Sequence, residues 1–411
     1  MTVTDHEATG GDPPQYPVTD FDQTAGERRS VGDSMAMYDR LREQYRPFLR
    51  STKGAEGHWV LTTCAAQRDA YQHPEIFSNT AITVYDPNPT EGLLIPEMID
   101  PPLHTKWRQL LASWFSPGAV AKLEDKVRMR CTTLIDGLKD RGECDYVRDF
   151  AQQYPTSIFL DIMGLGSEHL DQFMHWEDEI LHVAYKSPAD LRRTFDAQNA
   201  VSDMFREVMA DRRSRPGGSD DLVTAALSWQ IDGEQVTDDD LVALFLLLFE
   251  AGLDTVTNEI SYSTWHLATH PEDRARILAD PELIPVAIEE FLRYYAIVTP
   301  SRKAMADIEH HGCPIKKGDM VLMPLAAATR DPEEFPHADR VIIDRAPNNH
   351  IAFGAGPHRC LGSHLARREM RIGLEEWHKR IPNYRVPEGA DVPEYIGTQI
   401  GMASLPLVWD V

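Results

Sequence analysis

Most of the chain carries apolar residues at helical spacing, and a few short stretches show strand-like runs. Apolar positions three and four residues apart predict helices in four regions: 33–45, about 65–71, 103–115 and most of 117–215. Two β-like runs at 47–49 and 58–61 are separated by Gly54 and Gly57, which favour a turn. The pattern therefore predicts a mainly α fold with small β-sheets.

One predicted helix is unusually long and has an apolar middle. Thr237 is the expected N-cap, three aspartates follow it, and no proline occurs before Pro271. Thirty-odd helical residues span roughly 45–50 Å, enough to cross a domain. The apolar run 241–249 is bounded by Asp240 and Glu250, so we expect a buried central helix and not a membrane span.

Residues 1–30 differ in composition from the rest of the chain. Residues 1–30 are polar and lack the basic and apolar regions of a secretory signal, so we expect a flexible N-terminal segment. No break in composition divides residues 31–411, which are predicted to form one domain. Within it, 78–102 is rich in proline yet carries apolar residues, as expected of a wall or lid over an apolar ligand.

Charge and cysteine usage narrow the class of protein. A net charge of −24 repels nucleic acid and anionic lipid over most of the surface. No apolar run is long enough to span a membrane, and we expect a cytoplasmic protein without nucleic-acid or membrane partners. The cysteines are scattered without a Cys-x-x-Cys pair, which argues against a zinc site and a disulfide framework. They are Cys64, Cys131, Cys144, Cys313 and Cys360.

Cys360 is the cysteine with the most informative context. It lies in 353–362, Phe-Gly-Ala-Gly-Pro-His-Arg-Cys-Leu-Gly, and helical spacing begins at Leu361. At a helix N-terminus, free N–H groups and the macrodipole favour a thiolate, which can bind a metal. Gly354 and Gly356 would let the backbone approach a flat group. A lone cysteine before a helix is more often only a small buried hydrophobe, so the context has to decide.

The run Phe-Gly-x-Gly-x-His-x-Cys-x-Gly resembles the haem-binding signature of the cytochrome P450 family, with every fixed position filled. The segments 253–256 and 365–369 are most similar to its camphor-hydroxylase-like bacterial branch. The resemblance implies a single-domain fold whose long central helix crosses a buried haem b (iron protoporphyrin IX). Cys360 would then be the thiolate ligand of the iron. Phe353 would pack near it, and the amides of Leu361 and Gly362 would bind its sulfur.

The same resemblance implies partners for the two haem propionates. His104 and Arg108 lie four residues apart on one predicted helix, and Arg302 and His358 fill the other positions that the family uses. Carboxylates in an apolar crevice need cationic partners. Without the resemblance, His104 and Arg108 would be interpreted as a solvated pair on a helix surface.

The central helix contains Ala251-Gly252-Leu253-Asp254-Thr255, which resembles the oxygen-binding motif of the family. Asp254 and Thr255 would then be catalytic and manage protons at the reacting oxygen, with Ala251 against the haem. Gly252 weakens the helix, and Thr255 can bond to the carbonyl of Ala251. The alternative is a buried threonine that is satisfied by its own backbone.

The resemblance also places a set of side chains around the substrate: Leu247, Glu250, Ile297, Val298, Thr398, Gln399, Leu94 and Tyr85. An acid at position 250 departs from the apolar residue that is usual there in the family. Glu250 is predicted either to anchor a polar substrate group, with Gln399, or to turn away into a salt bridge. Behind the haem, Glu290, Arg293 and Arg345 are expected to form a structural lock.

Together these features predict a haem-thiolate monooxygenase that inserts one oxygen atom from O2 into a small or medium hydrophobic substrate, terpenoid-like or aromatic. The chain shows no flavin or iron–sulfur module, so electrons from NAD(P)H would arrive through a ferredoxin reductase and a ferredoxin. Arg359, Arg367, Arg368 and Arg371 would form the docking patch of a monomer. A peroxide-driven peroxygenase and a haem-binding sensor or carrier are the alternatives.

Overall fold

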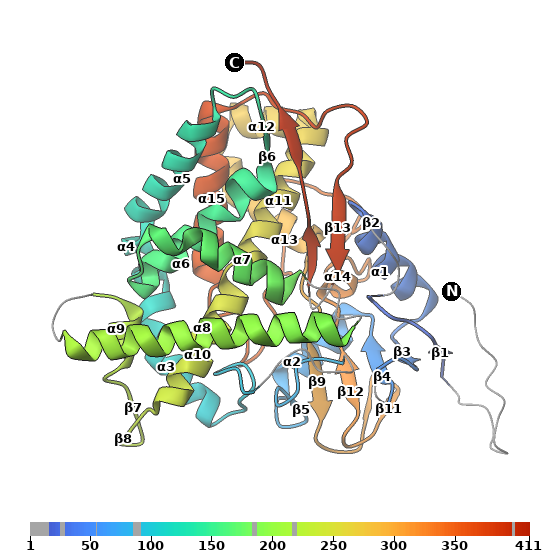
Figure 1. Ribbon diagram of the computed structural model, residues 1–411. Coiled ribbons are helices and arrows are strands. Elements are labelled where there is room, and N and C mark those ends of the chain that lie inside the picture. Colours follow the sequence, from blue (N-terminus) through green and yellow to red (C-terminus); the bar gives the residue numbers. More distant parts are fainter. Residues whose placement is uncertain are drawn as a thin grey trace.

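The computed structural model describes residues 16–24, 29–54, 56–84, 92–182, 187–215, 220–396 and 399–411. Helices make up most of the molecule, and the largest sheet lies to one side of them, at the lower right of Figure 1. The predicted mainly α fold with small sheets is confirmed. Among the described helices, none is both long enough and apolar enough to cross a membrane.

The helices follow the apolar spacing of the sequence. Their bounds are α1 (Asp33–Gln44), α2 (Cys64–Gln72), α3 (Leu103–Phe115), α4 (Pro117–Lys122), α5 (Glu124–Leu138), α6 (Gln153–Met163), α7 (Leu170–Leu181), α8 (Pro188–Ser214), α9 (Leu222–Ala226), α10 (Asp238–Gly252), α11 (Asp254–Thr269), α12 (Pro271–Ala279), α13 (Ile284–Tyr294), α14 (Leu325–Thr329) and α15 (Ser363–Arg380).

The largest sheet has six strands in the order β1-β3-β4-β12-β9-β5. Its predicted hairpin pairs β3 with β4, and Leu49 lies opposite Val60. The bounds are β1 (Val18–Thr19), β3 (Phe48–Ser51), β4 (His58–Leu61), β12 (Met320–Leu322), β9 (Ser301–Ala304) and β5 (Phe77–Ser78).

The remaining strands form four smaller sheets. These are β14 (Ile400–Met402) with β13 (Pro393–Ile396) and β2 (Arg29–Ser30), β10 (Ile308–His310) with β11 (Cys313–Ile315), β15 (Pro406–Val408) with β6 (Glu143–Asp145), and β7 (Gln230–Ile231) with β8 (Glu234–Gln235).

Part of the N-terminal segment belongs to the packed fold. Val18 pairs with Arg50 in the six-stranded sheet, and Arg29 pairs with Glu394. Phe21 is buried in the main hydrophobic core. The expected flexible segment therefore does not extend through residues 16–24 and 29–30, while 1–15 and 25–28 lie outside the described residues.

The central segment is buried as predicted, but it is two helices and not one. The side chain of Thr237 caps α10 by accepting a hydrogen bond from the amide of Asp240 at 3.2 Å. α10 and α11 meet at Leu253, whose φ of −98° and ψ of −71° interrupt the helix. Gly252 is a poor helix former, and the Thr255 hydroxyl donates to the Ala251 carbonyl at 2.9 Å, so both residues favour the break.

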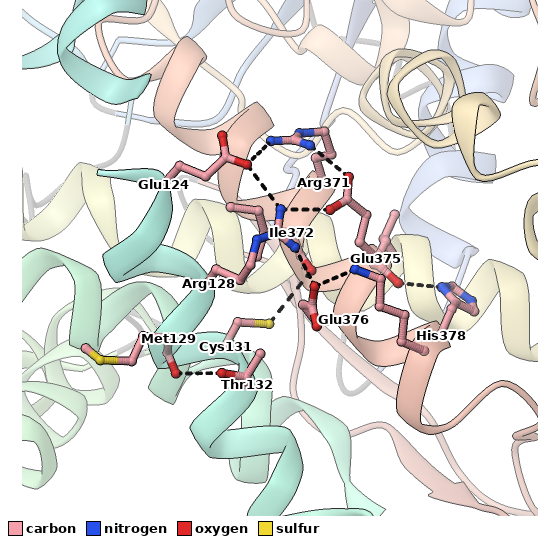
Figure 2. Close-up of polar contacts among 12 residues, drawn as sticks. Glu124, Arg128, Met129, Cys131, Thr132, Arg371, Ile372, Glu375, Glu376 and His378 are labelled. Carbon is pink, nitrogen blue, oxygen red and sulfur yellow. Dashed lines mark hydrogen bonds and ion pairs between the residues drawn. The ribbon is translucent and has the colours of Figure 1, made fainter. Parts of the chain in front are cut away.

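The helix that follows the cysteine loop, α15, is held between α5 and α11. Arg128 on α5 donates to Glu375 at 3.0 Å, and Arg371 on α15 donates to Glu124 at 2.9 Å (Figure 2). On the α11 side, a Cβ atom on Gly373 would lie 2.4 Å from the side chain of Ile260. Glycine at 373 therefore allows close helix packing, which fixes the direction in which the cysteine loop leaves α15.

The predicted lock behind the site is present and buried. Arg293 donates to both oxygens of Glu290 at 2.7 Å, and Arg345 donates to Glu290 at 2.8 Å. The side chains of Glu290 and Arg293 are fully buried. Because Arg293 also donates to the carbonyls of Thr329 and Ala338, the lock ties α13 to the chain that precedes the cysteine loop.

Candidate functional site

The site is built around the loop that carries Cys360. The Cys360 amide donates to the carbonyl of Phe353 at 2.8 Å, so Phe353 lies beside the cysteine as predicted. α15 begins at Ser363, two residues later than the sequence predicted. Gly356 has a φ of 69°, and a Cβ atom there would lie 2.1 Å from the carbonyl oxygen of Tyr71. Glycine is thus required at 356 for contact with α2, which corrects the expectation that it makes room for a flat group.

Burial and nearby charges act on the Cys360 sulfur in opposite directions. Burial raises the pKa of the thiol, whereas a hydrogen bond from the Gly362 amide and the charges of Arg108 and Arg359 lower it. The residue as a whole is nevertheless exposed. Gly362 interacts with the sulfur as predicted. A sulfur with a hydrogen-bond donor and cations around it is suited to bind a metal as a thiolate.

The four residues predicted to bind propionates come together near this sulfur. The ring of His104, on α3, stacks on the ring of His358 with 3.8 Å between centroids. Burial and the neighbouring His104, Arg302 and Arg108 lower the pKa of His358 to about 2. Burial and Arg108 lower the pKa of His104 to about 4. The interpretation of His104 and Arg108 as a solvated pair is therefore wrong for His104, which is 2% exposed.

None of these four side chains has a carboxylate partner among the described residues. In the same part of the chain, Nδ1 of His104 and Nε2 of His358 are buried without a hydrogen-bond partner. Burial lowers the pKa of both Arg108 and Arg302, and within the described part of the chain neither pairs with a carboxylate. Buried cations without counter-charges are costly. The two propionates of haem b would supply both counter-charges and acceptors, so the residues present fit this cofactor.

Asp254 is the hub of a buried hydrogen-bond network on α11. Its carboxylate is fully buried and accepts a hydrogen bond from the Tyr395 hydroxyl at 2.7 Å and one from the Gln399 amide. Nε2 of His182 lies 2.9 Å from Asp254, and Nδ1 of His182 lies 2.9 Å from Asp178. Since the Asp178 side chain is 56% exposed, the network connects Asp254 with solvent.

A second acid lies within this network. Glu177 is fully buried, and neither of its carboxyl oxygens has a hydrogen-bond partner among the residues that the structure describes. Burial, with the nearby Asp254 adding to it, raises the pKa of Glu177 well above its ordinary value. Burial opposes a charge on His182, but Asp254 and Asp178 raise its pKa well above the ordinary value. The network therefore places around Asp254 a buried acid whose protonated form is favoured and a histidine whose charged form is favoured.

Two further residues of the oxygen motif, Thr255 and Ala251, lie close to Asp254. Thr255 is half-buried and bonds to the Ala251 carbonyl, as both its functional and its structural interpretation require. Ala251 is exposed although Leu247 and Leu253, its neighbours on the same segment, are buried. One face of the central helices is thus accessible at the motif.

Four of the eight predicted substrate residues belong to, or pack against, the main hydrophobic core. Leu94, Leu247 and Ile297 are buried in the main core, and Val298 packs against it. Tyr85 and Thr398 lie outside the described residues. Gln399 forms a β-bridge with Val298, but its side chain binds Asp254. The prediction that Gln399 acts together with Glu250 is therefore wrong.

Glu250 has a different partner, from α8. Nε2 of Gln198 donates to Oε1 of Glu250 at 2.9 Å, and Gln198 is 4% exposed with no partner for its own oxygen. Burial raises the pKa of Glu250 to about 7, Gln198 lowers it, and the charge of Glu97 raises it further. Sequence reasoning missed Glu97 and Gln198, because nothing in their local pattern distinguishes them from surface residues.

The proposed docking arginines are mostly neutralised by neighbouring acids. Arg367 pairs with Glu289 at 2.6 Å, and both Arg368 and Arg371 pair with Glu124. Arg359 is exposed and, of the carboxylates that the structure describes, none pairs with it. The expected patch of four free cations is therefore reduced to one.

Three comparisons with known proteins bear on this arrangement. A family model described as "Cytochrome P450" matches residues 24–380. The chain is 35% identical to "Probable cytochrome P450 127A1" of Sinorhizobium fredii (87% of this chain and 85% of the relative). It is 33% identical to "Steroid C26-monooxygenase" of Mycobacterium tuberculosis (95% and 97%). Among solved structures, that of CYP101J2 has a TM-score of 0.85 at 30% identity, covering 97% of this chain and 98% of that one.

Proposed function

The chain belongs to the cytochrome P450 family of monooxygenases, and from this premise we propose that it hydroxylates a hydrophobic molecule that carries one polar group, with electrons from a ferredoxin. The observation that carries the proposal is the convergence of an exposed Cys360 with the half-buried Arg108, the buried Arg302 and two histidines that each have a ring nitrogen without a partner among the described residues. The relative named as a steroid monooxygenase supports an extended apolar substrate.

The family's cofactor is haem b, which supplies O2 activation and transfer of one oxygen atom when bound. Cys360 would hold the iron as a thiolate, and the hydrogen bond from the Gly362 amide and the charge of Arg108 would favour this ionised form against the burial that raises the pKa of the thiol. Arg108 and Arg302 would neutralise the propionates, and the free ring nitrogens of His104 and His358 would donate hydrogen bonds to them.

We further propose that Asp254 and Thr255 deliver protons to the reacting oxygen. Asp178 is exposed, and the His182 ring lies 2.9 Å from both Asp178 and Asp254, so a proton can enter at Asp178 and leave His182 toward Asp254. Rotation of the Asp254 carboxyl away from Tyr395 would bring the proton to the side of Thr255. In this scheme Thr255 orders the last transfer step.

Turnover assays distinguish three candidate activities: a monooxygenase, a peroxygenase, and a sensor or carrier. The haem-loaded protein should form product with NAD(P)H, a ferredoxin reductase, a ferredoxin and labelled O2, and the product should carry one labelled oxygen atom. Product from peroxide alone at an equal rate would indicate a peroxygenase. Tight substrate binding without product under either condition would indicate a sensor or carrier.

Thr255→Ala is expected to consume NAD(P)H while forming little product. Positioned proton transfer contributes roughly 10²–10⁴-fold to rates, so we expect product per reductant to fall by at least about tenfold. The matched control is Thr269→Ala at the end of α11, whose hydroxyl makes the same bond to the carbonyl four residues earlier, at 2.8 Å. Unchanged coupling in Thr255→Ala would show that Thr255 is only structural.

The acids near the substrate predict a preference for cationic ligands. Glu97 has no hydrogen bond or ion pair with a described residue, and its charge acts on Glu250. An alkyl chain ending in trimethylammonium, which cannot coordinate iron, should bind more tightly than its neutral tert-butyl analogue. Opposite unit charges about 4 Å apart attract by about 4 kcal/mol at an effective dielectric constant of about 20, so we expect a difference of at least about tenfold in affinity. Calorimetry on the haem-loaded protein measures this difference.

The preference should depend on pH, because the pKa of Glu250 is raised to about 7. Below pH 7 Glu250 is protonated and neutral, so affinity for the cation should rise as the pH increases through 7. Glu250→Gln should remove this rise and leave the tert-butyl analogue unaffected. If both ligands respond equally to pH and to the substitution, Glu250 does not recognise the substrate.

Arg359 is expected to contribute more to ferredoxin docking than the paired arginines. Arg359→Gln should slow reduction by ferredoxin several-fold and weaken its salt dependence, because an unpaired cation acts at longer range than a neutralised one. Arg368→Gln is the control, since Glu124 already neutralises Arg368. Stopped-flow reduction at several ionic strengths compares them, and equal effects of the two substitutions would place the docking face elsewhere.

A further inference from the structure

A cluster of histidines and one aspartate lies between α2 and the β10–β11 hairpin, apart from the residues assigned to the haem. Asp69 is on α2, His73 follows its last turn, and His310 and His311 lie at the end of β10 and in the hairpin turn. Together they line a surface pocket. Asp69, His310 and His311 each direct one potential ligand atom to a common point, with all three atoms within 4.8 Å of one another.

The separations match those around a small metal ion. Oδ2 of Asp69 lies 3.3 Å from Nε2 of His311 and 3.7 Å from Nδ1 of His310. Zinc bonds to nitrogen and carboxylate oxygen are about 2.0–2.2 Å long, so neighbouring ligand atoms in a tetrahedral site are about 3.4 Å apart. A small rotation of the exposed His311 ring would therefore complete the geometry.

Contacts around the cluster fix the position of the proton on His310 and the orientation of the Asp69 carboxylate. Nε2 of His310 lies 2.8 Å from the carbonyl of Ala66, which can only accept, so that nitrogen carries the proton and Nδ1 faces Asp69 with its lone pair. Nε2 of His73 lies 3.4 Å from Oδ1 of Asp69 and holds the carboxylate in place, as neighbouring groups do for metal ligands.

The hairpin turn brings both histidine rings to the same side. Successive side chains of a strand point to opposite faces. His311 has a φ of 51°, in the left-handed region that residues other than glycine seldom adopt. This turn ends the alternation, and the His310 and His311 rings lie 4.7 Å apart, both near Asp69.

We propose that Asp69, His310 and His311 bind a divalent transition-metal cation of the zinc class, with His73 as a positioning residue and solvent completing the coordination. Imidazole and carboxylate ligands suit zinc, whereas Mg²⁺ and Ca²⁺ prefer sites built from oxygen. The ion would fasten the hairpin to α2. The sequence argument against a zinc site concerned cysteine ligands, and this site contains no cysteine.

Titration of the haem-loaded protein with Zn²⁺, followed by calorimetry at pH 7.5, tests the proposal. We expect one saturable site at micromolar Zn²⁺, no such site with Mg²⁺, and a higher melting temperature with Zn²⁺. Asp69→Asn and His311→Asn should each weaken binding by about tenfold or more, since even partners of metal ligands contribute 10- to 100-fold. Asparagine at 311 tolerates the left-handed backbone, so this variant preserves the turn.

Two controls separate this site from other zinc-binding groups. His169→Ala removes an exposed histidine that lies 4.0 Å from Glu168, and His182→Gln removes the histidine of the Asp254 network. Both should bind Zn²⁺ as the unmodified protein does. Two results would overturn the proposal. One is the absence of a saturable Zn²⁺ site at concentrations up to about 100 times the micromolar range expected of a three-ligand site. The other is unchanged Zn²⁺ affinity in both Asp69→Asn and His311→Asn.

Discussion

Cys360→His is expected to retain some haem and to lose monooxygenation entirely. Neutral imidazole can coordinate the iron but lacks the electron donation of a thiolate, which favours O–O cleavage. The protein should still hold the cofactor, because Arg108, Arg302, His104 and His358, which would bind its propionates, are unchanged. Product formation with the complete redox chain measures the effect, and haem content by absorbance shows that the cofactor is present.

The matched control is Cys144→Ala. Cys144 is a free, half-buried cysteine, and burial raises the pKa of its thiol, as burial also does for Cys64, Cys131 and Cys313. This variant should turn over at the rate of the unmodified protein. Hydroxylation by Cys360→His at a comparable rate would show that Cys360 is not the ligand on which activity depends.

Arg293→Ala should destabilise the folded protein by about 3–5 kcal/mol, since breaking a buried ion pair leaves an uncompensated charge. The side chains of Arg293 and Glu290 are fully buried, and Arg293 also satisfies the carbonyls of Thr329, Ala338 and Arg340. Denaturant unfolding of the haem-loaded protein measures the loss. Less haem should be retained, because the lock holds the chain that leads to the cysteine loop.

Arg206→Ala provides the comparison for this lock. Arg206 pairs with Asp203 at the same i,i+3 spacing, but the two side chains are 51% and 73% exposed. Exposed pairs contribute about 0–1 kcal/mol, so the midpoint of unfolding should hardly move. If Arg293→Ala is no more destabilising than Arg206→Ala, the buried lock does not stabilise the fold.

The features that the structure places where the sequence predicted them are those that depend on local patterns. The cysteine loop, the acid–threonine pair and the strands at 48–51 and 58–61 each occupy one short segment, so spacing and turn residues were sufficient. Local patterns did not predict every break within a helix. The long apolar run at 241–249 predicted one helix, whereas the bond from Thr255 to Ala251 and the poor helix propensity of Gly252 divide the segment at Leu253.

What the sequence could not predict are contacts between distant segments. His182 and Tyr395 meet Asp254 from 72 and 141 residues away, and His311 meets Asp69 from 242 residues away. Both clusters form only after the chain has folded.

The prediction of a docking patch of four free arginines was wrong for the same reason. Arg367 and Arg368 are close to the cysteine loop in sequence, but Glu289 and Glu124, which neutralise them, come from α13 and α5. A run of like charges in the sequence therefore did not predict a charged surface.

The absorbance spectrum of the reduced, carbon monoxide-bound protein tests thiolate ligation by Cys360 most directly. The unmodified protein should show the Soret band of a haem-thiolate, and Cys360→His should instead show the band of a histidine-ligated haem at similar haem content. A histidine-type band in the unmodified protein, or a thiolate-type band that persists in Cys360→His, would contradict the assignment of Cys360 as the iron ligand.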